Sequence, residues 1–167
     1  VAHHPDNTRP LEDFFQDAAS GDLPSFAWIN PLLGINITSG IGSNDQHPDH
    51  DMRAGEQLYK AVYEALRAGP SWNDTLFILT FDEHGGFYDH VMPPNVGVPS
   101  PEDPPTKSYP YKNFTFDRLG VRIPTLLASP WIPKGTVLSA PPASQKPTDT
   151  SEYELTSILS TARKLLG

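Results

Sequence analysis

The amino-acid sequence predicts an α/β fold in which a mostly parallel sheet is flanked by helices. A helix-periodic segment at 52–70 is followed, after a short turn, by the uncharged run TLFILTF at 75–81. A second apolar run, RIPTLLASPWI, lies at 122–132. This order of helix and strand is typical of a parallel sheet that helices cover. A continuous rather than alternating apolar run is typical of a strand buried on both faces.

Length and charge restrict the classes of protein to which this chain can belong. Its 167 residues fit one ordinary domain, and its formal net charge is −8 with no basic tract. Nucleic-acid binding is disfavoured, because it needs lysines and arginines that face phosphates. The chain has no cysteine, which excludes disulfides and cysteine zinc sites. No apolar stretch approaches the length of a membrane span.

The N-terminal sequence VAHHPDNTRP reads as the middle of a loop and has no initiator methionine. We therefore expect the chain to be part of a longer one. Glycosylation sequons begin at Asn36, Asn73 and Asn113. Chance occurrence is the alternative, but three sequons in a short chain favour a secretory route and a secreted or membrane-associated protein.

The first third of the chain predicts a short helix and a strand. Residues 8–21 read as a helix that Thr8 caps and Gly21 ends. The run SFAWINPL at 25–32 is rich in aromatic and β-branched residues, which favours a strand.

The segment 52–70 predicts an amphipathic helix of about four turns. Asp51 is placed to cap it, and Gly69 with Pro70 ends it. Its apolar residues recur one turn apart, at Leu58, Val62 and Leu66.

A last helix is predicted at 151–167. Ser151 and Glu154 match the S-x-x-E capping box at its start. The expected buried stripe consists of Leu155, Ile158, Leu159, Ala162 and Leu166.

Acidic residues follow the strand predicted at 75–81. Asp82 and Glu83 come directly after it, and in parallel sheets ligands bind beyond the carboxyl ends of the strands. Carboxylate oxygens suit Mg²⁺, Ca²⁺ or Mn²⁺ and also join histidine around Zn²⁺. The pair predicts a divalent metal site of open identity. The alternative is that the two carboxylates cap the turn that follows.

The rest of this loop carries residues that support or shape a site. Gly85 and Gly86 let the backbone approach a ligand, but a tight turn needs them equally. His84 is a candidate metal ligand or donor to a phosphoryl oxygen. Asp89 and His90 have the form of a carboxylate orienting an imidazole. A structural hydrogen bond that pins the loop explains them equally well and is favoured.

The loop NDQHPDHD at 44–51 contains a further candidate, His47. It lies about 35 positions before Asp82, across one helix and one strand. Because such a unit brings consecutive strand ends to one edge of a sheet, His47 is expected to approach Asp82. The alternative is a polar loop that precedes a capped helix.

Two arginines near the second apolar run allow two interpretations. Arg118 and Arg122 have the chemistry to clamp a phosphate with two hydrogen bonds. Alternatively Asp117 and other acids pair with them, and this second interpretation is favoured.

Three long motifs resemble one family, the phosphoesterases that include the non-specific phospholipases C and bacterial acid phosphatases. They are SNDQHPDHD, VYEALRAGPSWNDTLFILTFDEHGGFYDHVMPP and FDRLGVRIPTLLASPWIPKGTV. The chain matches the family patterns D-E-x-x-G-x-x-D-H-V at 82–91 and G-x-R-x-P-x5-P at 120–130.

The resemblance implies an alkaline-phosphatase-like fold and a metal-assisted hydrolysis of phosphate esters. Asp82 and Glu83 resemble the metal-binding pair, and His47 resembles the histidine that contacts the phosphoryl group or assists the leaving group. His47 and His84 are thus the candidate catalytic residues. The implied substrate is a phosphate ester or phospholipid, with peripheral membrane contact as an option.

Departures from the family pattern limit these expectations. The E-N-R-S-F-D and T-x-P-N-R motifs, which in the family supply further metal ligands and the nucleophile, do not occur here. Leu155 stands where relatives often have histidine. Residues 1–167 therefore resemble a single partial domain that lacks its N-terminal half, with an incomplete active site and no expected activity alone. The competing hypothesis is a non-catalytic domain that binds metal or an anionic lipid headgroup.

Overall fold

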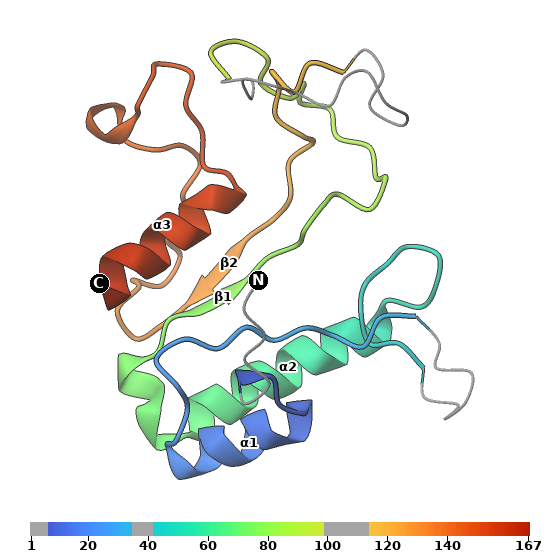
Figure 1. Cartoon of the computed structure of the whole chain (residues 1–167), viewed down its shortest axis with the longest axis vertical. Coiled ribbons are helices and arrows are strands. Elements are labelled where there is room, and N and C mark those ends of the chain that lie inside the picture. Colours follow the sequence, from blue (N-terminus) through green and yellow to red (C-terminus); the bar gives the residue numbers. More distant parts are fainter. Residues whose placement is uncertain (1–6, 35–41, 99–113) are drawn as a thin grey trace. The chain divides into compact units, whose positions relative to one another are not determined.

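The computed structural model describes residues 7–34, 42–98 and 114–167. These residues form two compact units, one from within 1–79 and 126–134 and one from within 80–125 and 135–167. Figure 1 follows the elements along the chain. The first unit contains helices α1 (Leu11–Ser20) and α2 (Arg53–Ala68), the 3₁₀ turn η2 (Pro70–Asp74) and strands β1 (Phe77–Leu79) and β2 (Leu126–Ala128), whereas the second contains η3 (Ala143–Gln145) and α3 (Leu155–Leu166).

Helix α1 confirms the predicted helix but not its predicted cap. The helix begins after Pro10, whose φ of −56° already suits helical backbone, so the cap position falls two residues after Thr8. Gly21 ends the helix in the left-handed conformation at φ 87°, and its N–H donates to the carbonyl of Asp17 at 2.9 Å.

Helix α2 carries the core of the first unit, as predicted. Leu58, Val62 and Leu66 are its buried apolar residues. Residues from α1 and from the turns and strand around it pack against them: Leu11, Phe14, Phe15, Leu23, Ile29, Trp72 and Phe77.

The end of α2 touches α1 closely. Gly69 follows the helix as predicted, and Pro70 starts η2. A Cβ atom built on Gly69 would lie 2.3 Å from the carbonyl oxygen of Ala18 in α1. Only glycine permits this approach without a shift of backbone.

The two strands pair antiparallel, which contradicts the predicted parallel arrangement for this pair. Phe77 lies opposite Ala128, and Leu79 lies opposite Leu126. Parallel pairing needs a crossover that is usually a helix. The described residues between the two strands contain no helix, and the chain returns to run against β1.

The strands are also less buried than the sequence suggests. All three residues of β1 are only half-buried, and in β2 the side chain of Leu126 is 64% exposed. The expectation of a strand buried on both faces is therefore wrong for the described structure. The predicted strand at 25–32 is absent, because the backbone of Leu32 bonds to the backbone and side chain of Asn44 instead of to a strand.

Helix α3 confirms the predicted helix, with a different start and a different environment. The capping box joins Glu154 and Ser157, and the Ser157 hydroxyl accepts the Glu154 N–H at 3.1 Å. Ser151 instead accepts the backbone N–H of Thr148. No residue of α3 is buried, and Leu159 is 65% exposed, so the predicted buried stripe is wrong within the described residues.

Candidate functional site

The loop that follows β1 presents two carboxylates at the surface. Asp82 and Glu83 are both exposed. Oε2 of Glu83 accepts the N–H of Gly85 at 2.7 Å and lies 3.6 Å from Nδ1 of His84. Glu83 therefore caps the following turn, which was the alternative to metal binding. Apart from this contact, Oε1 of Glu83 and both carboxylate oxygens of Asp82 have the chemistry of ligands for a hard metal ion.

Two glycines form the turn after these carboxylates. Gly85 and Gly86 have φ values of 67° and 73°, in the left-handed region that side chains disfavour. The N–H of Phe87 closes the turn onto the carbonyl of His84 at 3.2 Å. The glycines thus serve a tight turn.

Asp89 is held by an arginine rather than by its neighbour His90. Nε and Nη2 of Arg122 donate to its two carboxylate oxygens at 2.7 and 2.8 Å. The N–H of Val91 donates to the same carboxylate at 3.1 Å. The Arg122 guanidinium, followed by the Val91 N–H, holds the pKa of Asp89 well below its usual value. His90 is exposed, with Nδ1 3.5 Å from Asp89.

These contacts confirm that Arg122 pairs with an acid and that Asp89 pins its loop. Arg118 behaves differently. Its guanidinium lies over the ring of Phe114, 4.5 Å from the centroid, and it forms no ion pair within the described part of the chain. The predicted pairing of Arg118 with Asp117 is therefore not seen.

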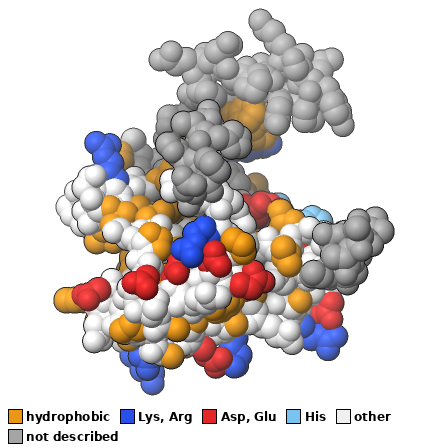
Figure 2. All heavy atoms as spheres, turned by 60° about the horizontal axis from the view of Figure 1, so that its bottom comes forward, with side chains coloured by type: hydrophobic (Ala, Val, Ile, Leu, Met, Phe, Trp, Pro, Cys, Tyr) orange, Lys and Arg blue, Asp and Glu red, His pale blue; other side chains and the backbone are white. Residues whose placement is uncertain are grey.

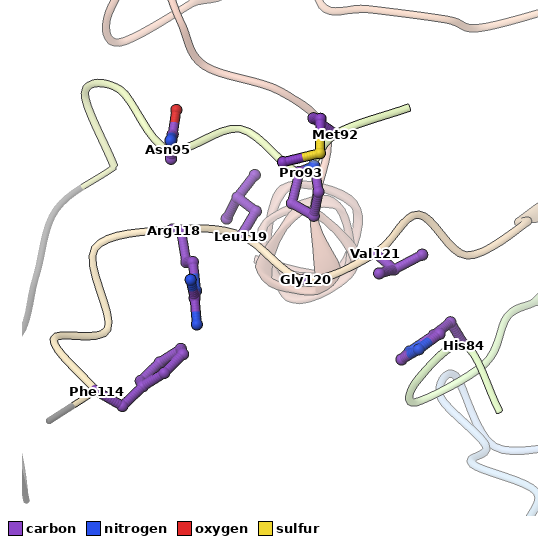
Figure 3. A pocket seen from close by; sticks show the side chains of 9 residues that line it. All are labelled: His84, Met92, Pro93, Asn95, Phe114, Arg118, Leu119, Gly120 and Val121. Carbon is purple, nitrogen blue, oxygen red and sulfur yellow. The ribbon is translucent and has the colours of Figure 1, made fainter. Parts of the chain in front are cut away.

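A pocket of about 410 Å³ opens beside His84 in the second unit (Figure 3). Its walls are mainly apolar, and Arg118 is the permanently charged group among them. Sequence reasoning missed the pocket, because it forms where three separate segments meet. The lining residues are His84, Met92, Pro93, Asn95, Phe114, Arg118, Leu119, Gly120 and Val121.

His47 lies in the first unit, on the loop before α2. Its side chain is exposed, and Nδ1 lies 2.6 Å from Oδ1 of Asp49. This contact lowers the pKa of Asp49. His47 belongs to the first unit and Asp82 to the second, and their approach stays a prediction.

A buried contact that sequence reasoning missed holds the same loop. Asp45 is buried. Its Oδ1 lies 2.9 Å from Nε2 of His50, which is within ion-pair distance, but the two atoms do not form a hydrogen bond. The Ser43 hydroxyl lies 3.2 Å from the same nitrogen. Burial, together with the charge of Asp45, raises the pKa of Tyr59 in α2. The sequence signal for this contact was Gly55, a glycine inside a helical pattern, which can mark a close approach of other chain segments. A Cβ atom built on Gly55 would lie 3.1 Å from the carbonyl oxygen of Asp45.

Asp51 supports the start of α2 from one position before the cap residue. Its Oδ1 accepts the N–H of Arg53 at 3.0 Å, and the Arg53 side chain binds the carboxylate at 2.6 Å. Hydrogen bonds from Arg53 lower the pKa of Asp51 to about 2. Asp51 therefore shapes the loop rather than facing a ligand.

The described residues contain no group of three or more His, Asp or Glu side chains arranged to hold a metal ion. Asp82 and Glu83 belong to no such group there, and metal binding by the pair stays a prediction. Among the sequons, Asn73 is exposed in η2, whereas Asn36 and Asn113 lie outside the described residues. In the same described part, no helix combines the length and apolar character needed to cross a bilayer.

Comparison with known proteins gives consistent matches. The profile of the phosphoesterase family matches residues 2–167. Non-specific phospholipase C6 of Arabidopsis thaliana is 51% identical over 92% of this chain, and non-specific phospholipase C5 of the same plant is 48% identical over 91%. Non-hemolytic phospholipase C of Burkholderia pseudomallei is 31% identical over 74% of the chain. The matched region is 28% of the length of each plant protein and 18% of the bacterial one.

Proposed function

The chain belongs to the phosphoesterase family, and on that premise we propose that it forms part of a metal-assisted phosphoric ester hydrolase of the phospholipase C or phosphatase type. The observation that carries the proposal is the family match over residues 2–167, together with relatives that are named phospholipases C. The substrate would be a phosphate ester or a phospholipid. An alkaline-phosphatase-like fold for the whole domain is part of the same proposal.

Asp82 and Glu83 would hold the divalent ion. Both carboxylates are exposed, and hard oxygen ligands suit such an ion. When bound, the ion would polarise a phosphoryl oxygen and lower the pKa of the attacking hydroxyl. Further ligands and the nucleophile would come from residues outside this chain, since the longer relatives extend well beyond it.

Two histidines would have separate roles: His47 would assist the departure of the alcohol, and His84 would contact a phosphoryl oxygen. As the attacking oxygen bonds to phosphorus, the bond from phosphorus to the alcohol oxygen breaks, and that oxygen needs a proton. His47 is exposed and is the candidate donor. His84, which adjoins Glu83 and lines the pocket, would donate a hydrogen bond to a phosphoryl oxygen.

The apolar surface of the chain supports the proposal that another part of the domain covers it. Figure 2 shows hydrophobic side chains at the surface among acidic ones. No residue of α3 is buried, although the helix has an apolar stripe, as expected if a further part of the domain packs on it. Several bulky residues are more than 60% exposed, among them Trp28, Leu33, Leu126, Trp131, Leu159 and Leu165.

A non-catalytic domain that binds metal or an anionic headgroup is the second candidate. It is favoured by one observation, that this sequence lacks the E-N-R-S-F-D and T-x-P-N-R motifs to which the resemblance assigns further metal ligands and the nucleophile. In that case the Asp82–Glu83 pair would bind an ion without hydrolysis.

Hydrolysis by this chain and by a longer protein that contains it would test the proposal. Substrates would be a chromogenic phosphodiester, a chromogenic phosphomonoester and phosphatidylcholine, each with and without a chelator. We expect chelator-sensitive activity in the longer protein alone. Asp82→Ala should abolish it, whereas Asp22→Ala, at an exposed acid after α1, should not.

Unchanged hydrolysis in the Asp82→Ala variant would refute the assigned metal pair. A folded longer protein with no hydrolysis of any substrate would favour the binding domain.

A further inference from the structure

The turn η2 presents an asparagine that the proposed hydrolysis does not use. Asn73 is exposed and begins the sequon Asn73-Asp74-Thr75. Its side-chain amide has no hydrogen-bond partner among residues 7–34, 42–98 and 114–167. A glycan is bulky and belongs at the surface. An exposed asparagine whose amide holds no other contact can carry a glycan without loss of packing.

A tryptophan lies against the same residue, although it is 58 positions away in the chain. The indole N–H of Trp131 donates to the backbone carbonyl of Asn73 at 2.6 Å, and Trp131 is 77% exposed. Both residues belong to the first unit, and Figure 1 shows the arrow of β2 ending beside the turn that leads into β1. Because the indole N–H already has its partner, an apolar ring remains at the surface.

The atom that would carry a sugar and the carbonyl that holds the indole belong to one residue. The first sugar on Nδ2 of Asn73 would therefore start a few covalent bonds from the ring of Trp131. A pyranose sugar has a face of C–H groups, which packs on an aromatic ring as other apolar groups do. An indole that a hydrogen bond already orients loses little further freedom when a sugar covers it.

We propose that Asn73 is a site of N-linked glycosylation and that the indole of Trp131 packs on the first sugar. Nδ2 of Asn73 bonds to the anomeric carbon of a lipid-linked oligosaccharide diphosphate. The bond from that carbon to the phosphate oxygen breaks, its electron pair leaves with the diphosphate, and Nδ2 gives up one proton. The proposal needs a secretory route, which the three sequons favour, and it is independent of the proposed hydrolysis.

The hydroxyl of Thr75 indicates when this transfer takes place. A sequon needs the hydroxyl residue at its third position. In the folded chain that hydroxyl donates to the carbonyl of Ser71 at 2.7 Å. The transfer therefore precedes the closing of η2, and the sugar meets Trp131 once β1 and β2 have paired. Because the sugar contacts the ring in the folded chain alone, glycosylation should stabilise the folded state.

Secretion of the full 167-residue chain from a eukaryotic host tests the site. An added signal peptide directs the chain to the secretory route, and Asn36→Gln with Asn113→Gln leaves Asn73 as the remaining sequon. We expect the intact mass to rise by one N-linked glycan. The added mass should be lost on treatment with an N-glycosidase and be absent in Asn73→Gln. A secreted chain that carries no glycan at Asn73 would overturn the proposal.

Urea unfolding tests the role of Trp131. An endoglycosidase trims the glycan to its first sugar, and the trimmed chain is compared with Asn73→Gln, which has no sugar. We expect the trimmed chain to unfold at a higher urea concentration. When the same pair is compared in the Trp131→Ala background, most of this shift should disappear. Trp131→Phe, which keeps an aromatic ring, should retain more of the shift than Trp131→Ala.

Trp28 supplies a matched control in the same unit. It is 64% exposed, and its indole N–H donates to Oδ1 of Asn30 at 2.8 Å, but Pro31 and Leu32 exclude a sequon there. Trp28→Ala should leave the urea shift unchanged. An equal loss in Trp28→Ala, or an unchanged shift in Trp131→Ala, would overturn the contact between indole and sugar. None of these measurements depends on hydrolysis, so the two proposals fail separately.

Discussion

Asp89 and Arg122 lie 33 positions apart in the chain and meet through two short hydrogen bonds of 2.7 and 2.8 Å. The side chain of Asp89 is 14% exposed and that of Arg122 is 58% exposed. The pair fastens the loop that carries Asp82 and Glu83 to the segment just before β2.

This ion pair should make the stability of the chain depend on pH in the acidic range. The folded-state pKa of Asp89 is below its unfolded value of about 3.9, so its contribution is full above that value. The contribution is lost as the pH falls toward the folded pKa. We expect the midpoint of urea unfolding to drop from pH 7 to pH 3 by less in Asp89→Asn than in the wild type. Equal drops would contradict this assignment.

The turn after the carboxylates should require glycine for its backbone alone. Gly86 has a φ of 73°, and a Cβ there would meet no atom within 4 Å. Gly86→Ala should therefore cost about 1–2 kcal/mol through backbone strain. Gly120→Ala is the matched control, because that site is equally open and its φ lies outside the strained range. Denaturant unfolding of both variants would compare them, and an equal loss would exclude strain as the cause.

Asp45, the buried acid in the loop that contains His47, should contribute more to the free energy of unfolding than exposed acids do. Asp45→Ala removes the carboxylate 2.9 Å from His50 and leaves that ring only the more distant carboxylate of Asp49, at 3.9 Å. We expect a loss of about 1–3 kcal/mol in the free energy of unfolding. Asp22→Ala, at an exposed acid, should change it by less than about 0.5 kcal/mol. Similar values for the two variants would show that Asp45 contributes no more than a surface group.

The environment of α3 can be tested by comparing this chain with a longer protein. Leu58→Ala in the core should cost about 2–5 kcal/mol in both. Leu159→Ala removes a side chain that is 65% exposed, and its cost should be small in this chain. If another part of the domain covers α3, the same substitution should destabilise the longer protein clearly. A small cost in both proteins would argue against that cover.

Local patterns predicted the helices well, because helix formation depends on neighbours along the chain. The spacing of Leu58, Val62 and Leu66 identified both α2 and the face that it buries. Gly21 and Gly69 marked helix ends for the same reason.

Burial and strand pairing were predicted poorly, because both depend on distant parts of the chain. Leu159 has the periodicity of a buried residue, but its side chain is 65% exposed. The direction of β2 follows from how the chain returns, which the run of apolar residues does not encode.

The candidate site was predicted in part. The motif that contains Asp82 and Glu83 gave the family, which the comparisons support. The roles of the individual residues stay predictions. Arg118 was seen in the sequence, but its place on a pocket wall depends on three segments that only folding brings together.

The bonds between Leu32 and Asn44 have a consequence for solubility. The segment that they hold contains Trp28 and Leu33, both more than 60% exposed, and such a run in extended form can recruit other chains by strand pairing. Asn44 occupies the backbone groups of Leu32, and Pro31 offers no N–H to a neighbouring strand. One asparagine and one proline thus limit the backbone groups that this exposed segment offers for strand pairing.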